Sequence, residues 1–589
     1  MRTLYYNGNI YTGDPENPAA SAMAVEDGKI VWVGYEPGEG NSGGSGLGED
    51  SHGGSIPGED SQEGGGPGKD SHGESGSGRG GYQEGEGEEK TEKVDLRGRF
   101  VTPGFIDSHM HVVEYGKLLQ EVSLADCTGS LEQVCQRVKA FIEERRIMPG
   151  TWVCGRGWNQ DYFEGEKRFV NCHDLDRVST EHPIFLARAC GHVVSVNSKA
   201  MELAGVTRDS VQPADGYFQV DDRGEPLGIF EENAVSMVKD VIPAPAVSQV
   251  KEYILKAARS LNSFGITSVH TDDFLSLTGV DYEMILKAYR ELEAEGALTI
   301  KIYEQSQFED LDGLKEFVGK GYHTGAGSSY VKIGPLKIIG DGSLGARTAY
   351  LSQPYADKGD TRGIAVFTQE QLDDMIVYAH THGMQTAVHA IGDGIMERVV
   401  RAYEKALKEF PREDHRHGIV HCQITTKPLL EKIEELSLHA YIQTIFLDYD
   451  SKIAESRLGE ERAKETYQFK TLFQTGSASN GSDSPVETPN VMKGIQCAVT
   501  RTSLDGAKTF LPGQALTVEE ALASYTAMGA RASFEEGEKG MIKRGMAADF
   551  TVLNRDLTQT PPRDLGQAAV EQTYVDGVCV YERAEASQG

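Results

Sequence analysis

Two histidines one residue apart close the apolar stretch FIDSHMHVVEYG, residues 105–116. Alternate side chains of a β-strand point to one side, so His109 and His111 face the same way, with Asp107 on that face. Neutral imidazole is the commonest metal ligand in proteins. The spacing fits two ligands of one metal ion, but it also fits two hydrogen-bonded histidines at a strand end. Other parts of the chain must supply the remaining ligands.

Other residues that could bind metal ions stand near the ends of four later apolar runs. A single strand-end histidine is more often a core residue, and a single Asp before Ser-Pro is more often a turn residue or helix cap. Their recurrence in five of eight expected strands is harder to attribute to chance. Four histidines and an aspartate suit zinc, manganese or iron(II) better than calcium. The later residues are Lys337 in GPLKIIGDG, His389 in TAVHAIGD, His421 in GIVHCQ and Asp483 in SNGSDSP.

Lys337 is the unusual member of this set because a charged lysine is costly to bury in an apolar strand. It could be a solvent-facing charge, as Lys332 could. Beside divalent cations, however, an ammonium group would be repelled. A neutral amine can react with CO₂ to give a carbamate, whose two oxygens can bridge two metal ions.

A regular alternation of strands and helices would position these residues. Eight strand-then-helix units predict a (β/α)₈ barrel, which they fit better than a doubly wound sheet. In such a barrel, residues at the carboxyl ends of strands are catalytic. The expected strands are 100–111, 265–270, 298–305, 331–342, 385–394, 418–423, 438–445 and 477–485.

The rest of the chain divides around this barrel, which we place at residues 101–534. Residues 112–264 form an expected inserted subdomain on the carboxyl-end face of the barrel. Strand-like runs at 1–100 and 535–589 predict one small β-sandwich domain built from both chain ends. Within it, residues 36–93 hold 20 of the 68 glycines, with 14 acidic and 4 basic residues, a net charge of −10. This composition predicts a disordered insertion.

Composition narrows the functional class. The 589 residues are 39% hydrophobic, enough for a sizeable core, and the net charge of −32 argues against nucleic-acid binding. No apolar run approaches the roughly 20 residues of a membrane span. The N-terminus lacks the pattern of a signal peptide, and the eight cysteines form no CxxC pair, which favours a cytoplasmic protein. A homodimer is a further possibility.

The motifs PGFIDSHMH, LKIIGDGSLGARTA, VHAIGDG, IVHCQ and GSDSPV, in this order, resemble the amidohydrolase superfamily. They are most similar to its amidohydrolase 3 branch, the YtcJ-like proteins and N-substituted formamide deformylases. The resemblance extends to 191–206 and 539–556. It implies that His109, His111 and Asp483 hold a buried metal ion. It further implies that His389 and His421 hold a second ion and that carboxylated Lys337 bridges the two.

We expect the insertion and the loops to supply the residues that select the substrate. His192, in the GH…NS element of the insertion, is the first candidate, followed by Arg347, Trp158 and His270. Core packing explains His270 and Trp158 as well, and a salt bridge explains Arg347. Two positions depart from the branch, where acidic residues are usual: Val420 precedes the sixth-strand histidine, and Cys190 precedes Gly191-His192.

These observations predict a hydrolase that cleaves a non-peptide amide bond of a small molecule. A hydroxide bridging two divalent ions, most plausibly zinc, would attack the carbonyl. Asp483 would move the proton to the leaving amine. Two alternatives remain open. The first is a mononuclear deaminase-type enzyme on the same barrel, and the second is a catalytically silent binding or regulatory protein.

Overall fold

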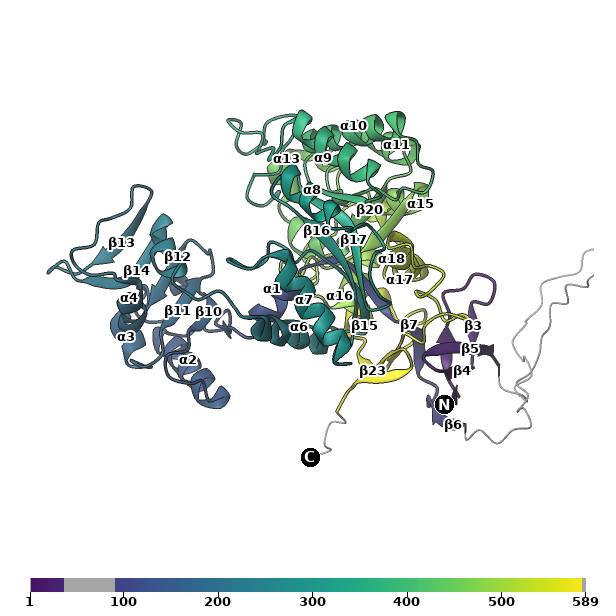
Figure 1. The fold of residues 1–589 in the computed structure, drawn as a ribbon, viewed down its shortest axis with the longest axis horizontal. Helices are drawn as coiled ribbons and strands as arrows, with labels where there is room; N and C mark the ends of the chain where they lie inside the picture. Colours follow the sequence, from purple (N-terminus) through teal and green to yellow (C-terminus); the bar gives the residue numbers. More distant parts are fainter. Residues whose placement is uncertain (1, 36–90, 585–589) are drawn as a thin grey trace, which may run out of the picture.

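The computed structural model describes residues 2–35 and 91–584, which fold around one parallel eight-stranded sheet (Figure 1). The expected insertion at 36–93 falls outside this description up to residue 90, and residues 92 and 93 already belong to a strand. The predicted (β/α)₈ barrel is confirmed. In spatial order its strands are β21 (Ser477–Asn480), β20 (His439–Ile442), β19 (Gly418–His421), β18 (Thr386–Ala390), β17 (Val331–Ile339), β16 (Lys301–Gln307), β15 (Ile266–Thr271) and β8 (Phe105–Met110).

The first and last strands meet through the loop that follows β21. The Asp483 amide donates to the carbonyl of His109 at 2.8 Å, and the His111 amide donates to the carbonyl of Ser484 at 2.8 Å. Gly481 allows this approach, because a Cβ there would lie 2.6 Å from the backbone nitrogen of His109. These contacts close the barrel at the end where the candidate ligands stand.

Helices follow the strands, as the alternation predicts. Several begin at side-chain caps; for example, Asp281 accepts the amide of Met284 at 2.9 Å at the start of α7. The helices are α1 (Val112–Leu118), α6 (Val247–Asn262), α7 (Tyr282–Ala294), α8 (Leu311–Gly319), α9 (Gln369–Thr381), α10 (Asp393–Glu409), α11 (Lys427–Glu435), α12 (Leu447–Asp450), α13 (Ala454–Leu458), α14 (Glu460–Ala463), α15 (Phe469–Thr475), α16 (Val491–Thr500), α17 (Val518–Ser524) and α18 (Ala527–Ala532).

The segment between the first two barrel strands carries its own six-stranded sheet. Figure 1 shows this insertion to one side, with α1, α6 and α7 between it and the barrel strands. Its expected place on the carboxyl-end face of the barrel stays a prediction. Its strands, in spatial order, are β13 (Gly216–Val220), β14 (Pro226–Glu232), β12 (Val193–Val196), β11 (Ile184–Arg188), β10 (Val153–Trp158) and β9 (Val122–Ser123); its helices are α2 (Leu131–Arg145), α3 (Cys172–Asp176), α4 (Ser198–Ala204) and α5 (Ser236–Lys239).

Strands from both chain ends form two further sheets that share a core. Strand β7 from the N-terminal part pairs antiparallel with β22 from the C-terminal part. Tyr5, Phe550 and Tyr574 pack in the shared core, with the rings of Phe550 and Tyr574 stacked 4.3 Å apart. One sheet is β5 (Lys29–Gly34), β4 (Ala22–Glu26), β1 (Arg2–Tyr6) and β6 (Glu92–Asp95); the other is β24 (Val578–Glu582), β23 (Val570–Val575), β22 (Phe550–Leu553), β7 (Phe100–Pro103), β2 (Asn9–Tyr11) and β3 (Ala19–Ala20).

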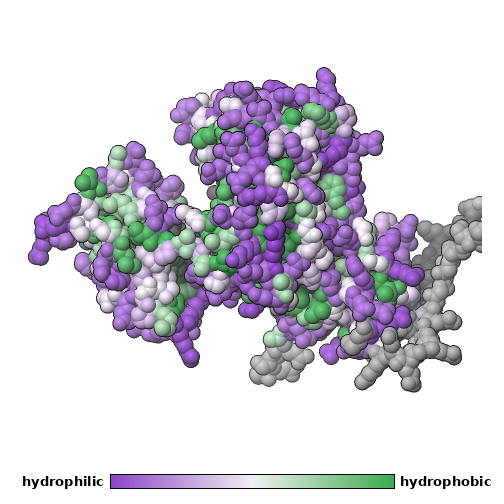
Figure 2. Space-filling model, in the orientation of Figure 1, coloured by the Kyte–Doolittle hydropathy of each residue, from purple (hydrophilic) through white to green (hydrophobic). Residues whose placement is uncertain are grey.

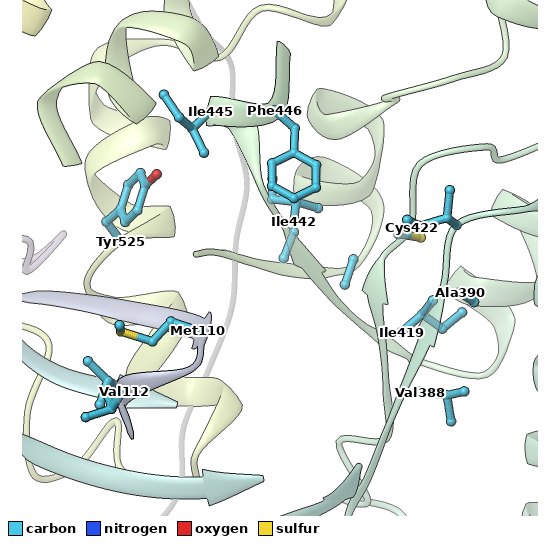
Figure 3. Close-up of a cluster of buried hydrophobic side chains, with 14 of the residues drawn as sticks. Met110, Val112, Val388, Ala390, Ile419, Cys422, Ile442, Ile445, Phe446 and Tyr525 are labelled. Carbon is cyan, nitrogen blue, oxygen red and sulfur yellow. The ribbon is translucent and has the colours of Figure 1, made fainter. Parts of the chain in front are cut away.

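Apolar neighbours of the candidate ligands anchor the strand ends in the core. Met110 stands between His109 and His111, while Val388 and Ala390 flank His389, and all three are buried (Figure 3). Because strand side chains alternate, this apolar set packs on the opposite side of the strand from the histidines. The outer surface in Figure 2 is mainly hydrophilic over the barrel. Among the described helices, none has both the length and the apolarity that crossing a bilayer requires.

Candidate metal centre

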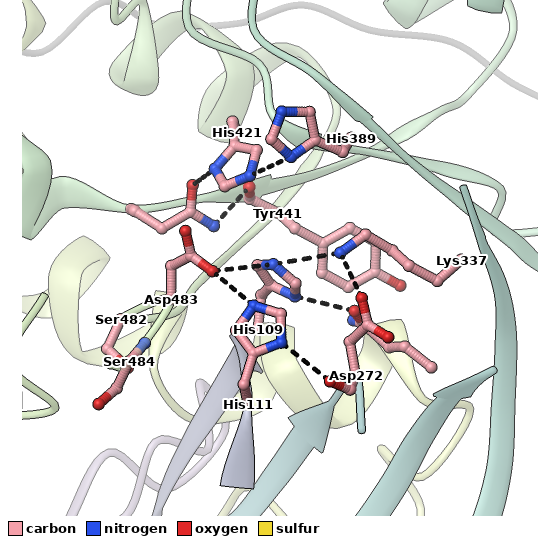
Figure 4. A network of polar contacts seen from close by, with 12 residues as sticks. His109, His111, Asp272, Lys337, His389, His421, Tyr441, Ser482, Asp483 and Ser484 are labelled. Carbon is pink, nitrogen blue, oxygen red and sulfur yellow. Dashed lines mark hydrogen bonds and ion pairs between the residues drawn. The ribbon is translucent and has the colours of Figure 1, made fainter. Parts of the chain in front are cut away.

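The two histidines of the HxH motif and an aspartate from the opposite end of the barrel sheet form one cluster (Figure 4). Oδ1 of Asp483 lies 3.2 Å from Nε2 of His109 and 3.1 Å from Nε2 of His111. One ligand atom from each of the three lies within 4.8 Å of the others. Asp483 adopts a left-handed backbone, with φ +56°. Such strain in a non-glycine residue is typical of functional sites.

His389 and His421 form a second pair above the first. Nδ1 of His389 and Nε2 of His421 are 2.9 Å apart, and the ring of His421 lies 5.6 Å from that of His109. His421 ends β19 with φ +76°, again a left-handed conformation. The strand thus turns sharply where it delivers this side chain to the centre.

Lys337 reaches the same space from β17. Its Nζ lies 3.3 Å from Nε2 of His109 and 3.1 Å from Oδ2 of Asp272, and the side chain is 1% exposed. Lys332, which we weighed as a similar lysine, instead pairs with Glu535 and Glu538 at 2.8 and 2.9 Å. The structure thus brings together all six residues that the sequence proposes as ligands.

An oxygen acceptor holds the outer nitrogen of every histidine in this centre. The outer nitrogen must donate its hydrogen to that oxygen, so the inner nitrogen of the neutral ring keeps its lone pair toward the centre. Metal-binding histidines are oriented in this way, and the donor set therefore fits metal ions. The acceptors are Gln305 Oε1 for His109 at 2.8 Å, the Asp272 carbonyl for His111 at 2.9 Å, Gln443 Oε1 for His421 at 2.8 Å and the Gly342 carbonyl for His389 at 3.3 Å.

Electrostatics favour an anionic carboxylate among mostly neutral rings. Burial acts to raise the pKa of Asp483, but its contacts with His109 and His111 outweigh burial and hold it well below the usual range. Burial and the charge of Lys337 lower the pKa of His389 to about 3. Burial lowers the pKa of His111, but the Asp483 carboxylate outweighs this and raises it to about 9. A metal ion bound at His111 would displace that proton.

Asp107, which shares the face of the histidines, lies beneath the centre rather than in it. Its Oδ1 accepts the amide of His109 at 3.2 Å and that of Ser482 at 3.0 Å. Burial raises the pKa of this carboxyl to about 7. It thus holds β8 against the loop that carries Asp483.

The four expected substrate residues lie elsewhere, and their substrate role stays a prediction. His192 is exposed on the insertion, 3.0 Å from Glu232. Trp158 is buried in the insertion, where its Nε1 donates to the Leu186 carbonyl at 3.2 Å. His270 is buried in the barrel against Tyr303, and Arg347 pairs with Asp357 at 2.8 Å. Among the described residues, none of the four forms a hydrogen bond or ion pair with a candidate ligand.

Sequence reasoning missed the residues that hold the ligands. Asp272 follows β15, Gln305 lies near the end of β16, and Gln443 follows β20. Their common signal is a polar side chain at the carboxyl end of a barrel strand. In the second barrel strand the prediction named His270 and did not include Asp272.

Comparisons with known proteins bear on the family and the fold of this chain. The family model described as the amidohydrolase family matches residues 92–581. The chain is 32% identical to the YtcJ protein of Bacillus subtilis (strain 168), over 99% of this chain and 100% of the relative. It is 25% identical to the N-substituted formamide deformylase of Arthrobacter pascens, over 99% of each. A solved structure, an uncharacterized metal-dependent hydrolase from Pyrococcus horikoshii OT3, is 26% identical with a TM-score of 0.71, over 95% of this chain and 99% of that chain.

Proposed function

This chain belongs to the amidohydrolase family and is a hydrolase, and we propose that it cleaves a non-peptide carbon–nitrogen bond using two divalent metal ions. The family resemblance of the motifs is confirmed by the match over residues 92–581. The observation that carries the proposal is the convergence of four inner histidine nitrogens, Asp483 and Lys337 on one buried space. Hydrolysis of small-molecule amides, including N-acyl and N-formyl amides, is the reaction class this centre suits.

The residues divide into two ligand groups. His109, His111 and Asp483 would hold one ion, and His389 with His421 would hold the other. Lys337, as a carbamate, would bridge them. Zinc fits the nitrogen-rich donor set, and manganese and iron(II) fit it too. When bound, two such ions would lower the pKa of a water between them and polarise the substrate carbonyl.

Asp483 has the position and charge to move the proton. Its carboxylate is buried and anionic beside the ligand nitrogens. It accepts a proton from the attacking water and passes it to the leaving nitrogen as the C–O bond forms and the C–N bond breaks. The buried ring of Phe446 stacks on that of His421, with the ring centres 5.8 Å apart. A cytoplasmic location and a homodimer stay predictions from the sequence.

Metal stoichiometry tests the proposal most directly. We expect elemental analysis of protein purified without chelator or added metal to find two transition-metal ions per chain. We expect Lys337→Ala to abolish activity and remove one ion. A single ion in the wild type, with an active Lys337→Ala variant, would instead identify the mononuclear deaminase-type enzyme. No ion after reconstitution with zinc or manganese and bicarbonate would identify a silent binding protein.

A further inference from the structure

One acidic residue outside the proposed ligand set contacts ligands from two different strands. Asp272 follows β15, and its side chain is 1% exposed. Its Oδ2 lies 3.1 Å from Lys337 Nζ. Its backbone carbonyl accepts Nδ1–H of His111 at 2.9 Å, and its backbone amide donates to the Met110 carbonyl at 3.0 Å. Asp272 thus connects β8 and β17 at the level of the metal centre.

The carboxylate of Asp272 is the only one within 4 Å of Lys337 Nζ among residues 2–35 and 91–584. Leaving either charge without the other in this buried space would be costly. Gln307, with its amide nitrogen toward Asp272, donates to both carboxylate oxygens at 3.1 and 2.9 Å. The carboxylate is therefore held in one orientation, and Nζ has Asp272 on one side and His109 on the other (Figure 4).

Carbamate formation keeps one hydrogen on this nitrogen. The Lys337 ammonium first loses one proton to water. The neutral amine then attacks the carbon of dissolved CO₂, an N–C bond forms, one C=O π bond becomes a carboxylate, and a second proton leaves to water. The remaining N–H still needs an acceptor in this buried site. Oδ2 of Asp272 can accept it before and after the reaction. Repulsion between like charges directs the new oxygens away from Asp272, toward the histidines.

We propose that Asp272 is a positioning residue that orients Lys337 for carboxylation and turns the carbamate oxygens toward the metal ions. This inference rests on the proposed function. It concerns a residue that does not itself bind a metal ion. The carboxylate of Asp272 and its backbone carbonyl act separately. The carboxylate pairs with Lys337, and the carbonyl accepts the hydrogen bond of His111.

Substitutions of Asp272 separate the effect of the carboxylate from that of the backbone carbonyl. Asp272→Ala removes the carboxylate and leaves the backbone carbonyl that holds His111. Asp272→Asn keeps the shape and a neutral acceptor, and neutral hydrogen bonds are about half as strong as charge-assisted ones. The matched control is Asp273→Asn, a neighbouring buried carboxylate bonded to Val113, Thr271 and Tyr289 rather than to the centre.

The experiment loads each protein with zinc and ¹³C-bicarbonate, and measures ions per chain, the ¹³C carbamate resonance and the melting temperature. For Asp272→Ala we expect one ion, no carbamate resonance and about 10- to 100-fold more bicarbonate to recover both. Asp272→Asn should be intermediate, and Asp273→Asn should match the wild type. A purely structural role would lower the melting temperature without this graded bicarbonate requirement.

The outcomes distinguish this inference from the proposed function. If the wild type holds two ions with a carbamate, and both Asp272 variants do so at the same bicarbonate concentration, the inference is overturned and the proposed function stands. If the wild type itself shows one ion and no carbamate, the bridged centre fails and the inference fails with it. Should Asp272→Ala not fold, the comparison of Asp272→Asn with Asp273→Asn decides in the same way.

Discussion

The two ends of the barrel interior each hold a buried lysine, but the lysines have different partners. At the amino end, Lys301 starts β16 and lies between Asp549 and Asp576, at 2.7 and 2.8 Å. At the carboxyl end, Lys337 has one carboxylate partner and a histidine nitrogen. At the first end the lysine is enclosed by two carboxylates, whereas ligand lone pairs converge at the second. Whether the polar atoms already have partners, more than the residue type, thus distinguishes a structural site from a binding centre.

Removing the charge of Asp483 should have the largest effect. Asp483→Asn keeps the size of the side chain but loses both the anionic ligand and the proton acceptor. We expect kcat to fall by about 10²–10⁴-fold and the metal content to drop. Activity assays with elemental analysis check this, and Ser482→Ala, next to Asp483 in the same loop, is the control. An active variant with full metal content would remove Asp483 from the mechanism.

At the amino end of the barrel, we expect a substitution to lower stability and leave the metal content unchanged. Lys301→Met leaves the carboxylates of Asp549 and Asp576 facing each other without their cation. Breaking a buried pair by removing one partner costs about 3–5 kcal/mol. We expect the free energy of unfolding in urea to fall by this order, with metal content unchanged. Loss of metal without loss of stability would contradict the division between the two ends.

The acceptors behind the histidines should matter less than the ligands but remain measurable. Gln443→Leu removes the oxygen that holds Nδ1 of His421. Such partners typically change metal affinity by about 10–100-fold, and we expect this loss in a competition assay with a chelator. Gln423→Leu is a matched control, since Gln423 bonds to Asp450 and Tyr467 instead. Equal affinities of the two variants would show that the histidine ring needs no such support.

A second buried histidine cluster differs from the candidate metal centre, because its ring nitrogens have no free lone pairs. Nδ1 of His417 accepts the amide of Thr386 at 3.0 Å, so its Nε2–H donates to Nδ1 of His380 at 2.8 Å. Nδ1 of His415 accepts the amide of His417, and its Nε2–H donates to the Leu436 carbonyl. Nε2–H of His380 donates to the Phe410 carbonyl. Every ring nitrogen is engaged, so no lone pair is free for an ion.

This cluster should make stability depend on pH. Burial lowers the pKa of His415 from 6.5 to about 4, so the unfolded chain takes up a proton before the folded chain does. Stability should therefore fall as pH drops from about 6.5 to 4. Urea midpoints between pH 7 and 4 check this, with His415→Gln showing a shallower fall. The same slope in both proteins would show that other groups control it.

The sequence shows which barrel strands end in possible ligands, but not which side chains reach the metal centre. His109, His111, His389 and His421 were identified because strand ends and alternate positions are visible in the sequence. Asp272 was missed in favour of His270, two residues earlier on the same face. Both positions have the same periodicity, and only the three-dimensional fold places one at the centre and the other beside Tyr303.

The insertion shows the second limit of the sequence. Its strands and helices follow from local patterns, whereas its place relative to the barrel depends on long-range contacts that no periodicity encodes. His192 was therefore expected near the substrate. In the structure it stands exposed on the insertion beside Glu232, with α1 and α6 between that subdomain and the barrel strands.

Replacing His192 should have the smallest effect and tests whether the insertion contributes to the reaction. An exposed ion pair contributes about 0–1 kcal/mol, so His192→Ala should change stability little. We expect kcat/KM to change by less than about twofold on an amide substrate. Steady-state kinetics with Glu232→Gln as the control check this. If His192→Ala raises KM severalfold while Glu232→Gln does not, the insertion reaches the substrate during turnover, and His192 belongs to the working site together with the strand-end ligands.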